Sequence, residues 1–362
     1  MAESESSAGL GRRTFVTGVV GLLGGIIAAV VGLPAVAYWL GPSLKKQASD
    51  AWVPLGPVEN IPVDTPTLFA FTRTKQLGWE RSATSYGVYV LRSADGTRKY
   101  LWRLADGVLI ESVGLPSGNR LTVCFSTQAG CAMGCAFCAT GIGGLNRDLG
   151  PGEMVDQVML VAEDFGRRVT NAVAMGQGEP FANYDATLGA LRFMNAEDDL
   201  GIGARHLTVS TCGLVAGIRR FAAEPEQFTL AVSLHSAVQA TRDRLMPGVK
   251  GIPLPELRAA LAEYAENTGR RPSLEYALIG GVNDTDAELV ALIAFCRGLL
   301  IHVNLIPVNP VAESGFHRSH AERIRAFSHA LQVAGIEASL RAERGTDIDA
   351  ACGQLRQRHA SG

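Results

Sequence analysis

Residues 121–141 read LTVCFSTQAGCAMGCAFCATG, a short apolar run that leads directly into a loop rich in cysteine. Three thiols of this loop, those of Cys131, Cys135 and Cys138, have the spacing Cys-x₃-Cys-x₂-Cys. Three thiolates placed in this way can bind three irons of a four-iron–four-sulfur cluster and leave the fourth iron open. A zinc ion would need a fourth protein ligand, and the loop contains no histidine. The alternative is a chance grouping of small buried cysteines.

Strands and helices alternate along the chain from about residue 96. Runs of apolar and β-branched residues predict strands, and the longer stretches between them predict helices. The predicted strands are 121–125, 172–175, 207–211, 229–234, 274–279, 303–308 and 337–340, and the predicted helices are 153–166, 184–196, 214–223, 255–267, 285–299 and 319–334. This alternation predicts an α/β fold with a parallel sheet, either open or closed into a barrel.

Polar and glycine-rich clusters follow nearly every predicted strand. In chain order they read STQAGCAMGCAFC, GQGEP, STCG, SLHS, IGGVND and IPVNP. In barrels of this kind the carboxyl ends of the strands carry the active site. The six clusters would therefore converge on one mouth, and this organisation indicates an enzyme.

The length and composition of the chain limit the number of domains and indicate the redox compartment. Its 362 residues, 47% of them hydrophobic, leave room for one large domain or two ordinary ones. A formal net charge of −2 gives no support by itself to nucleic-acid binding, which would then depend on local patches. Seven cysteines, three of them in one loop, indicate a metal or cluster site in a reducing compartment rather than paired disulfides.

The first forty residues differ in character from the rest of the chain. An uncharged run covers residues 14–43, which is long enough to cross a bilayer, and Arg12 and Arg13 precede it. The paired arginines also resemble a twin-arginine export signal. A transmembrane-like helix is therefore predicted within residues 1–43, with a buried soluble helix as the alternative. Two basic residues flank each end, so the orientation stays open.

The cysteine spacing, with Phe137 just before the last cysteine, resembles the signature of the radical S-adenosylmethionine superfamily. The sequence MGQGEP at 175–180 is similar to its Gly-Glu-Pro element. The motifs GGLNRDL, TVSTCG, SLHS, EYALIGGVND, NLIPVNP and RGTDIDAACGQL resemble the dual-specificity 23S rRNA and tRNA adenine carbon-2 methyltransferases. The likeness covers roughly residues 95–355. It implies a partial (β/α)6 TIM-like barrel, methyl transfer to RNA, a 4Fe-4S cluster and S-adenosyl-L-methionine.

The resemblance also implies which residues would hold the cofactors. The cluster would be bound by Cys131, Cys135 and Cys138. S-adenosylmethionine would be held by Gly178, Glu179, Ser210, Ser233, Leu234, His235 and Asn309. Two of these residues have alternative explanations. Glu179 could begin a helix, because a Glu-Pro pair is common there, and His235 could be a hydrogen-bonded histidine at a strand end.

Two thiols and a carboxylate acquire catalytic roles by the same resemblance. Cys352 would carry a methyl group from one S-adenosylmethionine, and a second one would supply the radical that activates this group. Glu111 would accept the proton of the ring carbon, and Cys124 would release the RNA by forming a disulfide with Cys352. Taken alone, both cysteines would more often be small core residues. Cys212 stands where the family usually has serine, and Cys296 is predicted to lie in the core.

The partners implied in this way are 23S rRNA, tRNA and a small reductant protein such as flavodoxin or ferredoxin, without need for an oligomer. Arg98 and Arg103 are candidates for phosphate contacts, or belong to the solvated surface. The protein would act in the cytoplasm, or be tethered to the cytoplasmic face of the membrane through residues 14–43.

Residues 1–94 carry a second resemblance, to the N-terminal anchor region of a Rieske iron–sulfur subunit. It rests on the paired arginines, the apolar run and the sequences WVPLGPVENIP and WERSATSYGVYVLR. The Rieske ligands, Cys-x-His and Cys-x-x-His, are absent from the chain. The predicted organisation is a transmembrane-like segment (1–43), a linker with a truncated Rieske-like segment (44–94), the methyltransferase core (95–355) and a tail (356–362).

Two alternatives to RNA methylation follow from the character of residues 1–94. One is a membrane-anchored Rieske-type electron-transfer subunit, which the missing ligands disfavour. The other is a non-functional hybrid that binds the cluster but not RNA, because the family normally has a small helical RNA-binding domain before the barrel. The junction near Arg92–Asp95 would be either a natural fusion or an artefact of gene assembly.

Overall fold

A computed structural model of the chain describes residues 12–27, 30, 61–63, 65–77, 80–309, 311, 313–341, 344–345 and 347–355. The chain divides into two units, Met1–Trp52 with Thr72–Ser85 and Val53–Phe71 with Tyr86–Gly362. All residues for which the sequence predicts a role in catalysis or cofactor binding belong to the second unit. The domain boundary predicted at residue 94 stays a prediction.

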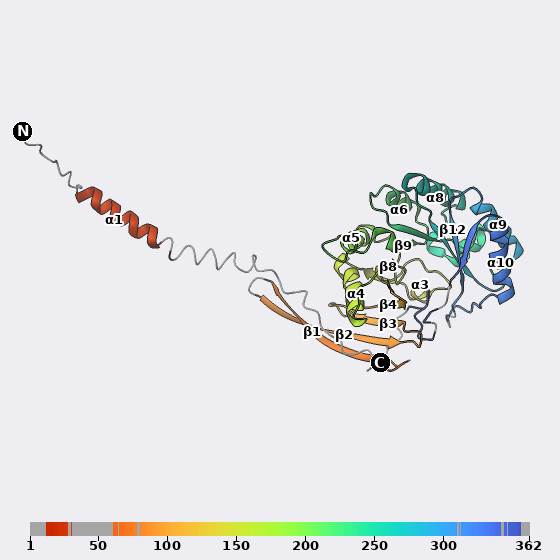
Figure 1. The fold of residues 1–362 in the computed structure, drawn as a ribbon, viewed down its shortest axis with the longest axis horizontal. Coiled ribbons are helices and arrows are strands. Elements are labelled where there is room, and N and C mark those ends of the chain that lie inside the picture. The colour runs from red at the N-terminus through yellow and green to blue at the C-terminus, as the bar shows by residue number, and fades with distance from the viewer. Residues whose placement is uncertain are drawn as a thin grey trace, which may run out of the picture. The chain divides into compact units, whose positions relative to one another are not determined.

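Helix α1 (Arg12–Ile27; red in Figure 1) is the described part of the predicted transmembrane segment. Its 16 residues span about 24 Å at 1.5 Å per residue, which is less than the ~30 Å hydrocarbon core of a bilayer. Among the described residues no helix is both long and apolar enough to cross a membrane. The predicted span over 14–43 is therefore not supported. Its part after residue 30 lies outside the described residues, as do residues 44–60 of the predicted linker.

One sheet contains most of the described strands, in the order β1-β2-β3-β4-β5-β8-β9-β10-β11-β12-β13. Neighbouring strands are antiparallel from β2 to β5 and parallel from β5 to β13. The bounds are β1 Thr67–Leu77, β2 Glu80–Arg92, β3 Arg98–Arg103, β4 Leu109–Ser117, β5 Arg120–Cys124, β8 Asn171–Ala174, β9 Leu207–Thr211, β10 Thr229–Ser233, β11 Ser273–Leu278, β12 His302–Pro307 and β13 Glu337–Leu340. Two short strands, β6 (Gln128–Gly130) and β7 (Leu145–Asp148), form a separate pair.

Helices connect the parallel strands, and Figure 1 shows the larger ones in an arc around the outer side of the sheet. Their bounds are α3 Ala139–Gly143, α4 Pro151–Asp164, α5 Tyr184–Asn195, α6 Val215–Ala222, α7 Gln239–Leu245, α8 Leu254–Thr268, α9 Asp286–Cys296 and α10 Ala321–Val333, with 3₁₀ turns η3 Ala204–His206 and η4 Pro247–Val249. The predicted parallel α/β arrangement is confirmed, since the predicted strands and helices all occur at their expected places. Helix α7, which the sequence did not predict, packs beside the cysteine loop.

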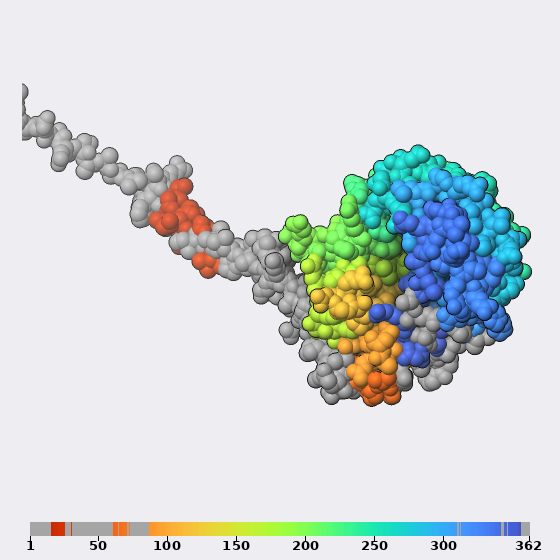
Figure 2. Space-filling view, turned by 45° about the vertical axis from the view of Figure 1, so that its right-hand side comes forward, coloured from red at the N-terminus to blue at the C-terminus, as the bar shows by residue number. Residues whose placement is uncertain are grey.

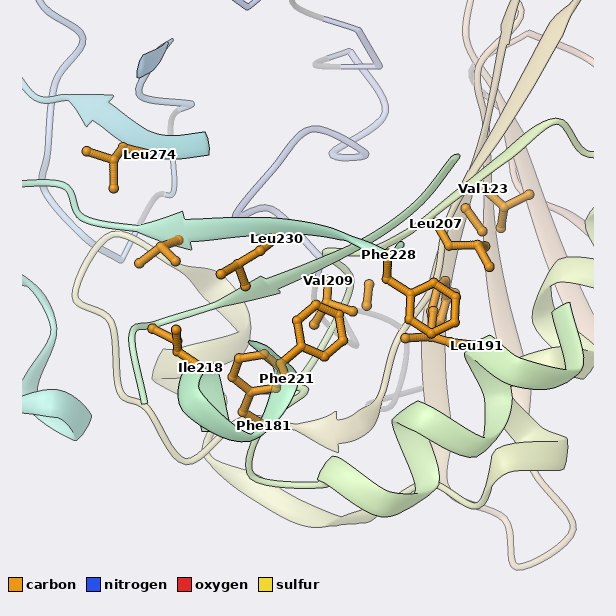
Figure 3. Close-up of a cluster of buried hydrophobic side chains, with 14 of the residues drawn as sticks. Val123, Phe181, Leu191, Leu207, Val209, Ile218, Phe221, Phe228, Leu230 and Leu274 are labelled. Atoms are coloured by element: carbon orange, nitrogen blue, oxygen red, sulfur yellow. The ribbon is translucent and has the colours of Figure 1, made fainter. Parts of the chain in front are cut away.

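The core between the sheet and the helices is apolar because both elements turn one hydrophobic side toward the other. Figure 3 shows this for side chains from β9 and β10 on one side and from α5 and α6 on the other. Val209, Leu230, Leu191 and Ile218 are all completely buried there. Burial of each such side chain stabilises the fold by about 1.5–3 kcal/mol. Cys296 of α9 lies in the same core, as predicted.

The predicted junction near residue 93 lies in a tight turn between β2 and β3. The Ser93 amide donates a hydrogen bond of 2.8 Å to the Thr97 carbonyl, and Gly96 in this turn has a φ of +83°. On β2, Val88 and Val90 are completely buried in the same core as the later strands. The end of the segment predicted to be Rieske-like therefore supplies a paired strand and core side chains to the sheet.

Candidate active site

A cavity of about 150 Å³ opens where the parallel strands end. It is lined by ten of the residues that the sequence singles out, namely Cys131, Cys135, Cys138, Gly178, Glu179, Ser210, Ser233, His235, Asn309 and Cys352. They come from the loops after β6, β8, β10 and β12, from strands β9 and β10 themselves, and from the C-terminal segment. The expectation that the post-strand clusters meet at one mouth is therefore confirmed for the clusters that supply these residues. Leu234, Cys124 and Glu111 do not line this cavity.

The cysteine loop is held in place by backbone contacts. The Cys131 amide donates to the Gly144 carbonyl at 2.8 Å, and the Ala136 amide donates to the Leu245 carbonyl of α7 at 2.9 Å. Gly141 allows α3 to approach the loop closely, because a Cβ at this position would lie 2.7 Å from the Cys135 nitrogen. These contacts fix the three thiols at the cavity wall.

The loop thiols suit a positively charged inorganic group, since Cys131 and Cys135 are buried and Cys138 is partly buried. Burial raises the pKa of Cys131 to about 12, and its neighbours Cys135 and Cys138 act in the same direction. Thiols in such a place become thiolates only if they bind a metal. Among the described residues, no group of three His, Cys, Asp or Glu side chains is arranged to hold a single metal ion. A four-iron cluster does not require such a group, because each iron takes one thiolate.

Glu179 is a buried carboxylate held by backbone amides. Its Oε1 accepts a hydrogen bond from the Phe181 amide at 3.0 Å, and its Oε2 accepts one from the Cys212 amide at 2.6 Å. Burial raises the pKa of Glu179, although these donors act against it. Gly178 before it has a φ of +107°, and a Cβ there would lie 2.7 Å from the Gln128 nitrogen. The turn therefore needs glycine to bring the carboxylate to the cavity.

His235 lies at the cavity wall with a φ of +54°, which is uncommon for a residue other than glycine. Its Nδ1 is 2.9 Å from the Ala277 amide and accepts its hydrogen bond, so the proton of the neutral ring is on Nε2. Burial lowers the pKa of His235 to about 3, with a further contribution from the charge of Arg242. The ring is therefore neutral at physiological pH, and it contacts Phe137 edge-to-face.

A second cavity of about 100 Å³ adjoins the first. Cys124 lines only this second cavity, whereas Cys352 lines both. The other residues common to both cavities are Met175, Ile306, Asn309 and Arg341. Cys352 therefore stands between the space next to the three loop thiols and the space next to Cys124.

The segment that carries Cys352 is tied to the end of the cysteine loop. The Ala139 amide donates to the Gly353 carbonyl at 2.7 Å, and the Thr140 hydroxyl donates to the Leu355 carbonyl at 2.6 Å. The Asn309 amide group donates to the Cys352 carbonyl at 3.0 Å. These contacts explain how a residue near the end of the chain reaches the site.

The same segment also contacts β3 and β4, and Figure 2 shows its dark blue atoms beside the orange ones of that region. The Ser93 hydroxyl donates to the Asp347 carboxylate at 2.6 Å, and the Lys99 ammonium donates to the Asp349 carbonyl at 3.2 Å. Arg344 donates to the Pro116 carbonyl. The C-terminal segment thus bridges the antiparallel and parallel parts of the sheet.

Cys124 and Cys352 are both free thiols, as are the other five cysteines. Burial raises the pKa of Cys124 to about 12, and the nearby Cys352 adds to this effect. The positive charge of Arg341 and the Met175 amide act in the opposite direction. The expected disulfide between Cys124 and Cys352 is not formed in this structure.

Glu111 lies on β4 and does not line either cavity. Its carboxylate is buried and lies 3.0 Å from the Lys99 ammonium. It is on the same face of β4 as Val113, which pairs with Cys124 across the strands. The predicted proton acceptor is therefore on the side of the second cavity, with Lys99 as its ion-pair partner.

Arg341 and Glu275 also line the first cavity, although neither was predicted as a site residue. The Arg341 guanidinium is 3.8 Å from the Glu275 carboxylate, and the charge of Cys352 raises the pKa of Arg341. Glu275 lies on β11, and Arg341 directly follows the last residue of β13. A signal was available for Arg341, because it is a charged residue directly after the predicted strand 337–340.

Comparisons with known proteins agree with this site. Residues 125–296 match the family model of the radical SAM superfamily. The chain is 50% identical over 270 residues to a probable dual-specificity RNA methyltransferase RlmN from Synechococcus elongatus, covering 73% of this chain and 74% of that one. A similar protein of the same name from Alkaliphilus oremlandii is 48% identical over 270 residues, covering 75% and 79%.

A solved structure is similar over the same part of the chain. The crystal structure of a radical SAM methyltransferase from Sphaerobacter thermophilus superposes with a TM-score of 0.71 at 49% sequence identity. The match covers 74% of this chain and 81% of that one. It supports the α/β fold with its parallel sheet.

Proposed function

Because the chain belongs to the radical S-adenosylmethionine methyltransferases of the dual-specificity RlmN family, we propose that it methylates carbon 2 of adenine in 23S rRNA, tRNA or both. It is an S-adenosylmethionine-dependent radical methyltransferase, and its cofactors are a 4Fe-4S cluster and S-adenosyl-L-methionine. The observation that carries the proposal is the place of Cys352, which lines both cavities.

Cys352 would act first as a nucleophile. Carbon 2 of adenine is too weak a nucleophile to attack a sulfonium methyl group, whereas a thiolate can do so. The sulfur of Cys352 would bond to the methyl carbon while the bond from that carbon to the sulfonium breaks. When bound, the cluster and a second S-adenosylmethionine supply a radical that removes a hydrogen atom from this methyl group and lets its carbon bond to adenine. Cys352 must therefore face both the cofactor and the base.

The release of the product would use Glu111 and Cys124. Once the new carbon–carbon bond has formed, Glu111 would accept the proton that leaves carbon 2, and the unpaired electron left on the adduct would pass to a one-electron acceptor such as the oxidised cluster. The Cys124 sulfur would attack the Cys352 sulfur, so that a disulfide forms while the bond between Cys352 and the transferred carbon breaks. That carbon would keep the electron pair and take up a proton, which completes the methyl group. A reductant would then return both cysteines to thiols.

The first cavity would hold both cofactors. Cys131, Cys135 and Cys138 would bind three irons. Glu179 would accept hydrogen bonds from the ammonium group of S-adenosylmethionine, since a buried carboxylate pairs favourably with a cation. The rest of the cofactor would contact Gly178, Ser210, Ser233, His235 and Asn309, which line this cavity, whereas the contact predicted for Leu234 would have to come from behind the lining.

The target adenine would enter the second cavity from an unpaired RNA loop, because a base must leave its stack to be modified. Electrons would come from a small reductant protein such as flavodoxin or ferredoxin. RNA and such a reductant meet in the cytoplasm, where we expect the protein to act.

The proposal is tested by anaerobic reconstitution of the full chain with iron, sulfide and S-adenosylmethionine, followed by mass spectrometry of digested rRNA and tRNA. We expect 2-methyladenosine from the wild type and none from Cys352→Ala. Unmodified RNA from a wild type with a full cluster would contradict the proposal. Peptide mapping should find methylated Cys352 in the wild type.

A further inference from the structure

Arg242 brings a positive charge into the interior next to the cysteine loop. It lies on α7 and is completely buried. Its Nη2 donates a hydrogen bond of 2.7 Å to the Cys212 carbonyl, whereas its Nε and Nη1 have no hydrogen-bond partner among the described residues. A guanidinium keeps its charge in proteins, and its burial is unfavourable unless a negative group compensates it. The described carboxylates form no ion pair with it within 4 Å.

The surroundings of Arg242 point to the cluster as the missing negative group. The sulfur of Cys212, whose carbonyl accepts the bond from Arg242, lies 3.9 Å from the sulfur of Cys135. The end of α7 accepts the Ala136 amide through Leu245. The following turn packs so closely that a Cβ at Gly248 would lie 2.5 Å from the Met133 Cα. Helix α7 is therefore a direct support of the loop that would bind the irons.

The backbone beside Arg242 is shaped to let the guanidinium approach. Gly213 has a φ of +95°, and a Cβ there would lie 2.9 Å from the Arg242 Nη2 and 3.2 Å from Leu257. Any larger residue at 213 would push the guanidinium away from the Cys212 carbonyl. The charge is thus held at a defined place behind Cys135 and Cys212.

We propose that Arg242 is a fixed counter-charge for the iron–sulfur cluster, a positioning residue that makes the cluster easier to reduce and to retain. Three thiolates bring three negative charges, two of which the oxidised four-iron core offsets, and reduction by one electron adds another. A nearby positive charge stabilises the more negative, reduced form. This inference rests on the proposed assignment of Cys131, Cys135 and Cys138 as cluster ligands.

The test compares three variants of the full chain. Arg242→Lys keeps the charge, Arg242→Gln keeps a hydrogen-bond donor without the charge, and Arg244→Gln removes an exposed charge from the same helix. Each protein is reconstituted anaerobically, and its reduction potential is measured by titration with spectroscopic detection. Cluster loss to a chelator is followed in parallel, and urea unfolding is measured for the cluster-free proteins.

We expect Arg242→Gln to shift the potential to more negative values and to lose iron several-fold faster than the wild type. Arg242→Lys should stay close to the wild type, and Arg244→Gln should not differ from it. Cluster-free Arg242→Gln should be at least as stable as the wild type, because an uncompensated buried charge has been removed.

Three results would overturn the inference. These are an unchanged potential in Arg242→Gln, an equal shift in Arg242→Lys, and failure of cluster-free Arg242→Gln to fold, which would make the residue purely structural. A wild type that binds no four-iron cluster would instead refute the ligand assignment of the proposed function. The two failures are therefore distinguishable.

Discussion

The amide group of Asn309 donates a hydrogen bond of 3.0 Å to the backbone carbonyl of Cys352. Both residues line the first and the second cavity. A residue expected to contact S-adenosylmethionine thus also positions the residue expected to carry the methyl group. We therefore expect cofactor binding and the placement of the thiol to be coupled through this contact.

Replacement of Asn309 by Asp should therefore slow methylation of Cys352. The change keeps the size of the side chain but removes the donor, and an unsatisfied buried carbonyl costs about 1–3 kcal/mol. We expect RNA methylation to fall on the order of tenfold, with the cluster content unchanged. Methylation of Cys352 is measured by peptide mass spectrometry. Asn195→Asp, which removes a similar bond to the Ile202 carbonyl far from the cavities, should leave the rate unchanged.

The strands of the parallel sheet could be predicted from the sequence because each is a short apolar, β-branched run. Strand β9 (Leu207–Thr211) was predicted with its observed bounds. Helix α7 was missed because its sequence, QATRDRL, is polar and shorter than two turns. It is held by contacts with the cysteine loop, which is remote in sequence. The burial of Arg242 could not be foreseen for the same reason.

The site could be predicted only in part. The spacing of the three loop cysteines identified them directly, whereas Cys124 and Cys352 depended on a family resemblance. The second cavity, which Cys124 and Cys352 line and the three loop cysteines do not, became visible only in the structure. Glu111 lies outside both cavities. The register of β3 and β4 pairs it with Leu101, and its carboxylate forms an ion pair with Lys99, two residues away on β3.

Cys212 gives the cluster-free protein a site for disulfide formation. Its sulfur lies 3.9 Å from that of Cys135, and the resembling family usually has serine at this position. With oxidised glutathione, the two thiols should lose two protons and two electrons to form a disulfide, while glutathione is reduced to two thiols. Peptide mapping under non-reducing conditions should find this bond. Cys212→Ser should prevent it and keep the protein competent for reconstitution, whereas Cys296→Ser should have no effect. Absence of the bond in the wild type would refute the idea.

Arg341 should assist the attack of Cys124 on Cys352. Burial raises the pKa of Cys124 to about 12, and the charge of Arg341 counteracts this. The fraction of reactive thiolate rises with pH below that value, so Arg341→Gln should need a higher pH for the same rate of release. The covalent RNA–protein adduct should accumulate and can be followed on denaturing gels between about pH 7 and pH 9. Arg341→Lys should restore release, and identical pH profiles for the wild type and Arg341→Gln would count against this role.

His235 should make the cluster-free protein less stable in acid. Its pKa is lowered from 6.5 to about 3 in the folded chain, so the unfolded chain alone binds the proton between these values. The neutral buried ring therefore contributes to the free energy of unfolding. This contribution is fully present above pH 6.5 and is lost as the pH falls toward 3. Between pH 7 and pH 5 this loss amounts to about 2 kcal/mol. Urea unfolding of His235→Gln should show a smaller loss, whereas the exposed His329→Gln on α10 should behave as the wild type.

Variants of Glu111 and Lys99 can distinguish the contribution of their ion pair to stability from the proposed role of Glu111 as proton acceptor. The two groups are 3.0 Å apart, Glu111 is buried and Lys99 is partly buried. Lys99 also donates to the Asp349 carbonyl of the segment that carries Cys352. Loss of one partner of a buried ion pair costs about 3–5 kcal/mol, so Lys99→Met should unfold at lower urea concentration. The double variant Lys99→Met with Glu111→Gln should recover part of this loss, because it leaves no unpaired charge.

Only the variants that change Glu111 should stop proton removal from the adenine. Glu111→Gln is expected to accumulate a covalent RNA adduct while its cluster content stays normal, and Lys99→Met should turn over slowly. The control is Glu263→Gln, which breaks an exposed pair with Arg219 on the surface of the helices and should affect neither adduct nor turnover. Normal product formation by Glu111→Gln would assign the proton acceptor to another group, and the pair with Lys99 would then be structural.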